Sequence, residues 1–232
     1  MNYNNALKSF MRRVWHRPLH RADVIVPFKF LGTEYGGWPL LDATPQGSLV
    51  MSFGVGEDIS FDVGVIEEFG CVVHAFDPTP KSVEWIKRQI VPSAFHFHQL
   101  GLADRDCVVD FFPPGNDQHV SFSAEPGLDG GAAPPFQGEV KRLSSIIHEL
   151  GLPEPYALKM DIEGFEYDAI EDILSSSHRP CQFLVEFHHR RGRQGRAKTL
   201  HAVSRLRESG YKIFFISSTG REYGFVLGES ID

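Results

Sequence analysis

The chain has 232 residues, of which 42% are hydrophobic and 23% charged, a composition typical of a globular protein and unlike that of a disordered tail. Its net charge of −7 argues against a general nucleic-acid-binding protein. No apolar run approaches the roughly 20 residues of a transmembrane helix, and the N-terminus lacks a signal-peptide core. Three scattered cysteines without CxxC spacing predict neither a zinc site nor a disulfide framework, so we expect a reducing, cytoplasmic location.

Two basic segments interrupt this acidic chain. Residues 1–22 contain five Lys or Arg side chains and no acid, and so do residues 188–198. In the first segment, apolar residues at helical spacing predict an amphipathic helix. We interpret it as a helix docked on its own domain, with a lid, a partner-binding helix or a membrane-surface helix as alternatives. We therefore assign residues 1–45 to an N-terminal helical or cap segment and 46–232 to one main domain.

From Ser48 onward, short apolar runs alternate with segments of helical spacing. A Gly- and Pro-rich loop interrupts the series at about 113–138. This alternation is typical of a doubly wound parallel α/β sheet. The predicted strands are 48–53, 71–76, 94–100, 107–112, 156–162 and 181–187, and the predicted helices are 59–69, 80–90, 141–150, 165–175 and 199–209.

The chain ends differently. Residues 211–217 and 222–227 also have strand character, but only about four or five residues join them, too few for a parallel crossover. The sheet must therefore finish with an antiparallel hairpin. A doubly wound sheet of about seven strands with such an ending resembles the class I methyltransferase fold, which is Rossmann-like. Ordinary dinucleotide-binding Rossmann domains do not usually end that way.

Ligands of open α/β sheets lie beyond the carboxyl ends of the strands. After the first strand, Gly54 and Gly56 allow a tight turn and a close approach of a ligand to the backbone. The GxGxxG dinucleotide pattern is incomplete because Ile59 occupies its third position, and Glu57 and Asp58 would repel a pyrophosphate. This favours a zwitterionic amino-acid group as ligand, with a purely structural turn as the alternative.

The next two strands end in weaker candidates. Asp77 follows Gly56 by 21 residues, a spacing typical of an acid that accepts hydrogen bonds from ribose hydroxyls, although it can also cap the next helix. Leu102 follows the third strand, where an adenine would lie in such a fold. A plain turn explains that segment equally well.

Acids and a histidine follow the fourth and fifth parallel strands. Asp161 and Glu163 can act there as a base, metal ligand or substrate anchor, or can merely cap a helix. Glu186 and His188 share one strand face, because side chains alternate with period two. The acid can orient the histidine as a base or form an O/N metal site with it. One such pair is not specific for a metal, and no metal site is predicted.

Several of these motifs together resemble a known family. The runs SFGVGEDISFD (52–62), HAFDP (74–78) and LKMDIEGFE (158–166) resemble FkbM-type S-adenosylmethionine-dependent methyltransferases. They look most like a methyltransferase-like subgroup whose first motif is SFGxxxDxSFD. The stretches 32–38 and 185–189 resemble the same subgroup.

The resemblance covers roughly residues 30–227 and implies a class I methyltransferase fold, S-adenosylmethionine as cofactor and mostly O-methylation. Asp161 would lie beside the transferred methyl group. Ser52 stands where other methyltransferases commonly have an acid, which leaves Asp58 or Asp161 to bind the cofactor's ammonium group. The resemblance assigns cofactor binding to Tyr35, Gly36, Phe53, Gly54, Gly56, Asp58, Asp77, Leu102 and Asp161.

The catalytic base and the acceptor are less sharply defined. Asp161, Glu186 and His188 are candidates for the base, in no firm order. Glu163, His189 and Arg190 are candidates for acceptor binding, and the basic residues after His188 suggest an acidic or phosphorylated acceptor, with a solvated loop as the alternative. The resemblance implies a small-molecule or sugar-type hydroxyl acceptor.

Two other functions remain as alternatives. A nicotinamide-dependent Rossmann oxidoreductase shares the glycine turn and the acid that follows it, but lacks the third glycine and does not explain the terminal hairpin. A non-catalytic binding module on the same fold is disfavoured by the acids at three strand ends. No feature of the sequence predicts an oligomeric state.

Overall fold

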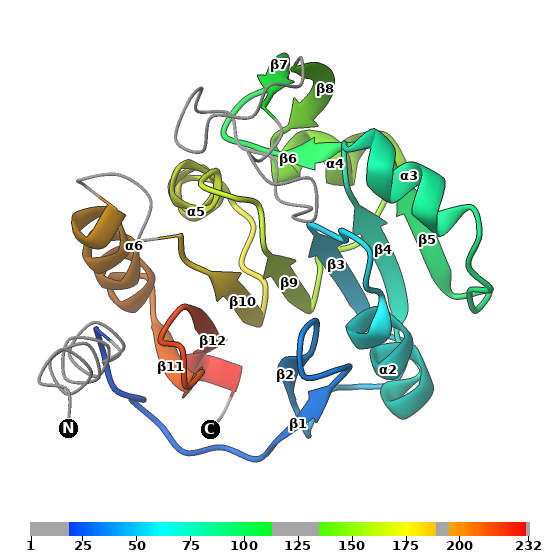
Figure 1. Cartoon of the computed structure of the whole chain (residues 1–232). Helices are drawn as coiled ribbons and strands as arrows, with labels where there is room; N and C mark the ends of the chain where they lie inside the picture. Colours follow the sequence, from blue (N-terminus) through cyan, green and yellow to red (C-terminus); the bar gives the residue numbers. More distant parts are fainter. Residues whose placement is uncertain (1–18, 113–134, 189–194, 231–232) are drawn as a thin grey trace, which may run out of the picture.

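The computed structural model describes residues 19–112, 135–188 and 195–230. Its centre is a seven-stranded sheet with the order β11-β12-β10-β9-β3-β4-β5 (Figure 1). The strands of this sheet are β3 (Leu49–Phe53), β4 (Val72–Phe76), β5 (Phe95–His98), β9 (Ala157–Met160), β10 (Gln182–Glu186), β11 (Tyr211–Ile216) and β12 (Glu222–Leu227).

The strand directions confirm the predicted sheet. Strands β3, β4, β5, β9 and β10 run parallel to their neighbours in this group. Strand β12 pairs antiparallel with both β10 and β11, which is the terminal hairpin expected from the short connection. The order of the strands reverses at β3, which lies between β4 and β9. In an open α/β sheet, this reversal places a ligand-binding crevice at the carboxyl ends of these strands.

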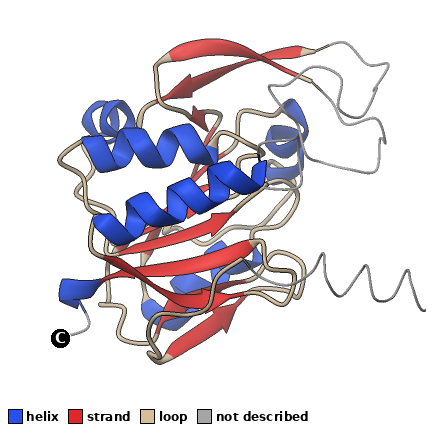
Figure 2. Cartoon of the chain, turned by 90° about the vertical axis from the view of Figure 1, so that its left-hand side faces the viewer, coloured by secondary structure: helices blue, strands red, loops and turns tan. Residues whose placement is uncertain are grey.

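Helices cover both faces of the sheet (Figures 1 and 2). One apolar cluster joins one face to α4, α5 and α6, and a second joins the other face to α2, α3 and the β1–β2 hairpin. Strands β3 and β9 are buried along their whole length, as expected for strands between two helical layers, although β9 contains Lys159. The helices are α2 (Ser60–Phe69), α3 (Pro80–Ile86), α4 (Leu143–Leu150), α5 (Glu166–Ser175) and α6 (Gly195–Glu208), followed after β12 by the short 3-10 helix η1 (Gly228–Ser230).

Two small sheets were not predicted. Strands β1 (Phe28–Leu31) and β2 (Trp38–Leu41) form an antiparallel hairpin, and Trp38, Leu40 and Leu41 are buried in the second apolar cluster. Strands β6 (Gly101–Leu102), β7 (Cys107–Phe111) and β8 (Phe136–Lys141) form a three-stranded sheet. It lies beyond the arrowheads of β3 and β4 in Figure 1, on the side of the predicted site.

Several predicted boundaries are wrong. Residues 136–138 belong to β8 and not to the loop. Helix α4 begins at Leu143 and not at residue 141, because Lys141 still pairs with β6 and Arg142 has an extended backbone. Helix α3 ends at Ile86, four residues early, in a turn. Helix α6 starts at Gly195, earlier than expected.

The structure does not test two other predictions about the organisation of the chain. The helix expected within residues 1–22 lies largely outside the described residues, and the division at residue 45 stays a prediction. Within the described ranges, no helix is both long and apolar enough to span a membrane.

Candidate functional site

A cavity of about 920 Å³ opens at the carboxyl ends of β3, β4, β9 and β10. It lies where the strand order reverses, as the fold requires. Every predicted site residue within the described part of the chain lines this cavity, whereas the predicted His189 and Arg190 are not among the described residues. The predicted residues in its wall are Tyr35, Gly36, Phe53, Gly54, Gly56, Asp58, Asp77, Leu102, Asp161, Glu163, Glu186 and His188.

The glycine turn after β3 is shaped by close packing against β9. Gly54 has φ +82°, and a Cβ atom added there would lie 1.9 Å from the backbone oxygen of Asp161. Only glycine fits, because any side chain would overlap this carbonyl. Gly56 also has a positive φ, +58°, but a Cβ added to it would meet nothing within 4 Å. Gly54 therefore packs the turn against the end of β9, and Gly56 leaves open space beside the cavity.

Asp58 ties the glycine turn to the β1–β2 hairpin. Its carboxylate accepts hydrogen bonds from the Thr33 hydroxyl at 2.7 Å and the Ser60 amide at 2.7 Å, and Thr33 in turn accepts the Gly36 amide at 2.9 Å. Burial alone would raise the pKa of Asp58, but its hydrogen bonds to Ser60 and Thr33 outweigh this and lower it. Asp58 is thus a fixed negative charge in the cavity wall, with the exposed Tyr35 at the rim.

Asp77 has a role that its sequence position did not reveal. One carboxylate oxygen accepts the amides of Val55 and Gly56, at 3.1 and 2.9 Å. The other accepts the amide and the hydroxyl of Thr79, at 2.8 and 2.6 Å. A carboxylate has about four acceptor positions, so donors of the protein already occupy them. Asp77 clamps the glycine turn to the start of α3, and contact with a ribose would require exchange of one of these bonds.

A buried lysine also binds the backbone of the glycine turn. Lys159 lies in β9, and its ammonium group donates to the carbonyl oxygen of Gly54 at 2.5 Å and lies 5.8 Å from the centre of the Trp38 ring. The nearby Asp62 is buried, and this burial raises its pKa to about 6, although the charge of Lys159 opposes the shift. The sequence placed Lys159 in a strand but gave no sign that its charge would be buried.

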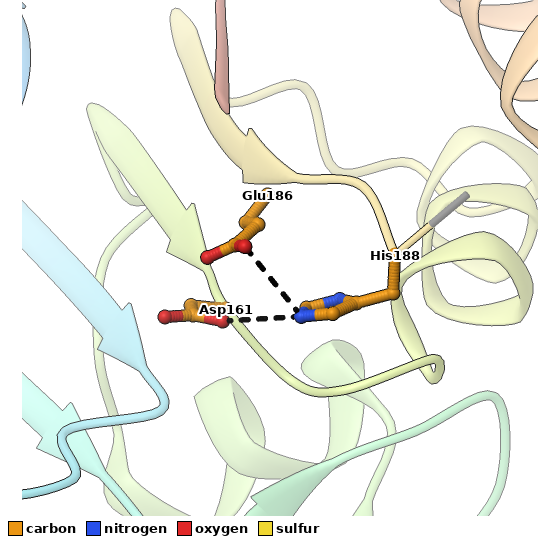
Figure 3. Close-up of side chains that lie close together, drawn as sticks. All are labelled: Asp161, Glu186 and His188. Carbon is orange, nitrogen blue, oxygen red and sulfur yellow. Dashed lines mark ion pairs between the residues drawn. The ribbon is translucent and has the colours of Figure 1, made fainter. Parts of the chain in front are cut away.

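Acids and one histidine form the opposite wall. Figure 3 shows Asp161 after β9, Glu186 at the end of β10 and His188 just beyond it, with their side chains directed toward one another. His188 Nε2 lies 3.8 Å from Asp161 Oδ1, 3.8 Å from Glu186 Oε1 and 3.1 Å from Glu163 Oε2. These side chains make up the acid–histidine cluster, which the predicted positions at the sheet edge bring together.

Glu166 holds the histidine from behind. It is fully buried and accepts the backbone amides of Gly164 and His188, at 2.6 and 2.9 Å, and it lies 3.2 Å from His188 Nδ1. Glu163 has a positive φ of 53°, which is unusual for a non-glycine residue. The turn formed by Glu163 and Gly164 lets the acids on either side of it face the same imidazole.

The cluster shifts the protonation of its members. Burial lowers the pKa of His188, but the hydrogen bond and charge of Glu166, with the charges of Glu163 and Asp161, outweigh it and raise the pKa to about 9. Burial and the neighbouring Asp161 raise the pKa of Glu186, against the opposing charges of His188 and Arg221. Arg221 Nη1 lies 2.7 Å from Glu186 Oε1.

The described lining of the cavity is negative. Among its described lining residues, eight are Asp or Glu and two, Lys159 and Arg221, are Lys or Arg. Such a wall attracts cationic groups and repels phosphates. Sequence reasoning did not find Glu166, Lys159 or Arg221, because their contribution depends on contacts between distant segments. For Glu166, the one available signal was its position as an acid in the first turn of the helix predicted at 165–175.

Comparison with known proteins agrees with this architecture. A family model described as the methyltransferase FkbM domain matches residues 53–213. The methyltransferase FkbM from Methylobacillus flagellatus KT is structurally similar, with a TM-score of 0.51 at 14% identity over 79% of this chain and 44% of that one. Human N-acetylserotonin methyltransferase, solved with SAM, gives a TM-score of 0.38 at 14% identity over 77% of this chain and 46% of that one. No curated protein sequence matched.

Strand order, terminal hairpin and cavity define a Rossmann-like class I methyltransferase fold. The chain spans less than half the length of the two solved structures it matches. The family match covers most of the chain, including the glycine turn and the acid–histidine cluster. The chain belongs to the FkbM methyltransferase family, as its motifs had indicated.

Proposed function

We propose that this chain is an S-adenosylmethionine-dependent O-methyltransferase acting on a hydroxyl group of a small-molecule or sugar-type acceptor. One observation carries the proposal. The backbone of Gly54 packs directly on Asp161, so the glycine turn and the acid–histidine cluster face one cavity. A cofactor bound on the turn would therefore present its reactive group to side chains able to accept a proton.

The charge of the cavity supports this cofactor over a dinucleotide. S-adenosylmethionine carries a sulfonium and an ammonium group and no phosphate, which suits a wall rich in Asp and Glu. Asp58 is a fixed carboxylate beside the turn, suited to pair with the ammonium group. The open space at Gly56 leaves room for the methionine part to approach the backbone. A nicotinamide cofactor would bring its pyrophosphate against the same acids.

The acid–histidine cluster supports transfer to oxygen. The cofactor, when bound, supplies an already activated methyl group, so the protein must mainly orient the acceptor and take up its proton. Asp161 has the most accessible side chain of the three candidate bases, 33% exposed against 13% for Glu186 and 5% for His188. We assign it the hydrogen bond to the acceptor hydroxyl, with Glu186 and His188 behind it.

The acid-lined wall also bears on the acceptor. The described part of the cavity would repel an acidic or phosphorylated acceptor. The basic residues that suggested one lie mostly within 189–194, outside the described residues. Within the proposal, the acceptor is therefore an uncharged or cationic hydroxyl compound.

Calorimetric titration tests the proposal directly. S-adenosylmethionine and S-adenosylhomocysteine should each bind with one site per chain, and NADH should not compete. A panel of sugars and small hydroxyl compounds, followed by mass spectrometry, should then show the gain of one methyl group on an acceptor oxygen. Absence of S-adenosylmethionine binding at millimolar concentration, or NADH binding in its place, would refute the proposal.

A further inference from the structure

The acid–histidine cluster holds several carboxyl groups close together. Asp161, Glu163, Glu166 and Glu186 surround a single imidazole. Among Asp161, Glu166 and Glu186, only Glu186 forms an ion pair with a Lys or Arg side chain of the described ranges, which is Arg221. A buried group of like charges is costly unless a cation joins it. The cluster therefore resembles the wall of a cation site.

The second observation is the orientation of His188. Its side chain is only 5% exposed. Glu166 accepts a hydrogen bond from the His188 backbone amide and lies against Nδ1 of the ring. A carboxylate behind a histidine in this way fixes the ring and its tautomer in metal sites. On the other side, Nε2 lies 3.1 Å from Glu163 Oε2 and points into the gap between Asp161 and Glu186, 3.8 Å from one carboxylate oxygen of each (Figure 3).

The dimensions of the gap fit a metal ion. One potential ligand atom from each of Asp161, Glu186 and His188 lies within 4.8 Å of the other two. Metal–ligand distances of about 2.0 to 2.2 Å separate two ligands of the same ion by about 3 to 4.4 Å. The two distances of 3.8 Å from Nε2 to the carboxylates fall in this range. Small side-chain movements would bring all three ligands onto one ion.

We propose that Asp161, Glu186 and His188 bind a divalent cation, with Glu166 as the carboxylate that positions the histidine. Two carboxylates and one imidazole form a mixed O/N donor set without sulfur, which suits Mn²⁺ and also accepts Zn²⁺. A cation at Nε2 takes the place of a proton there. Three protein ligands leave coordination positions open toward the cavity, as in catalytic metal sites.

The open positions indicate what the cation would do. An acceptor hydroxyl bound to it would lose its proton more easily, because a metal ion lowers the pKa of a bound hydroxyl or water. The proton would pass to Asp161 or to solvent, and the resulting oxygen would remain beside the glycine turn. This catalytic part rests on the proposed O-methylation, whereas binding of the cation does not.

The binding test uses the full chain, stripped with a chelator and titrated with MnCl₂. Loss of the free-Mn²⁺ signal in electron paramagnetic resonance should report one site per chain, and Zn²⁺ should displace the ion. Glu186→Gln should weaken Mn²⁺ binding at least about tenfold, and Glu166→Gln about 10- to 100-fold through the orientation of His188.

A matched control removes a charge from the same cavity without touching the cluster. Glu57 lines the cavity and pairs with Lys81 at 3.1 Å, so Glu57→Gln should leave Mn²⁺ affinity within about twofold of wild type. Circular dichroism and S-adenosylmethionine titration check that each variant is folded. Absence of stoichiometric binding, or equal weakening by Glu57→Gln and Glu186→Gln, would overturn the cation site.

The two proposals can fail separately. Stoichiometric Mn²⁺ binding without S-adenosylmethionine binding would support the cation site and refute the proposed function. Methyl transfer that continues unchanged in the chelated protein would overturn the catalytic role of the cation and leave the proposed function in place.

Discussion

Gly54 and Gly56 both have positive φ, but the structure assigns them different consequences when they are replaced by alanine. A left-handed backbone costs a non-glycine residue about 1 to 2 kcal/mol. Gly54→Ala adds the overlap of its Cβ with the Asp161 carbonyl at 1.9 Å, so its total cost should reach about 3 kcal/mol or more. Gly56→Ala meets no atom within 4 Å, so the folded protein should lose only about 1 kcal/mol.

Gly151 provides the matched control. It follows α4, has φ +62° and would also carry a Cβ in open space. Urea unfolding should therefore give Gly56→Ala and Gly151→Ala similar losses. Calorimetry should separate them, because the methyl group at Gly56 occupies space beside the cavity. We expect at least a tenfold weaker S-adenosylmethionine affinity, about 1.4 kcal/mol, for Gly56→Ala alone. Equal affinities in the two variants would show that the cofactor does not lie on this turn.

Two further predictions concern buried acids. Asp77→Asn should reduce the free energy of unfolding by about 1 to 3 kcal/mol, because it disrupts the hydrogen bonds to Val55 and Gly56. It should also reduce the S-adenosylmethionine affinity. Lower affinity with unchanged urea unfolding would instead indicate that Asp77 only binds the ribose. Burial raises the pKa of Asp62 to about 6, above its unfolded value near 3.8, so its ionisation destabilises the folded state as pH rises through this interval. The unfolding free energy of Asp62→Asn relative to wild type should rise by about 2 kcal/mol between pH 4 and pH 7, and a constant difference would contradict this.

The parts of the fold that depend on local patterns were predictable. The apolar runs with their glycine stops located the central strands, and the short final connection required an antiparallel pair. The β6–β7–β8 sheet was missed in part because β6 has only two residues and pairs with a strand more than thirty residues later. Hairpin β1–β2 was missed because a four-residue strand such as Trp38–Leu41 carries little periodic signal of its own.

The same distinction applies to the candidate site. The rule that ligands lie beyond the carboxyl ends of parallel strands was sufficient to predict that Asp161, Glu186 and His188 lie at one edge of the sheet. The partners of these residues could not be predicted, because Glu166 looks like an ordinary acid in the first turn of a helix. Only the packing of α5 beneath the end of β10 turns it into the group that fixes His188.

The contacts around Gly54 explain why the two walls of the cavity form one unit. Lys159 donates to the carbonyl oxygen of Gly54, and Asp161, two residues later on the same segment, packs its backbone against the Gly54 Cα. A displacement of the glycine turn would therefore move the acid that we assign to the acceptor. Within the proposed function, this backbone contact, and not mobile side chains, would set the distance between methyl donor and acceptor. Rigid placement of this kind is what an in-line transfer to a positioned oxygen requires.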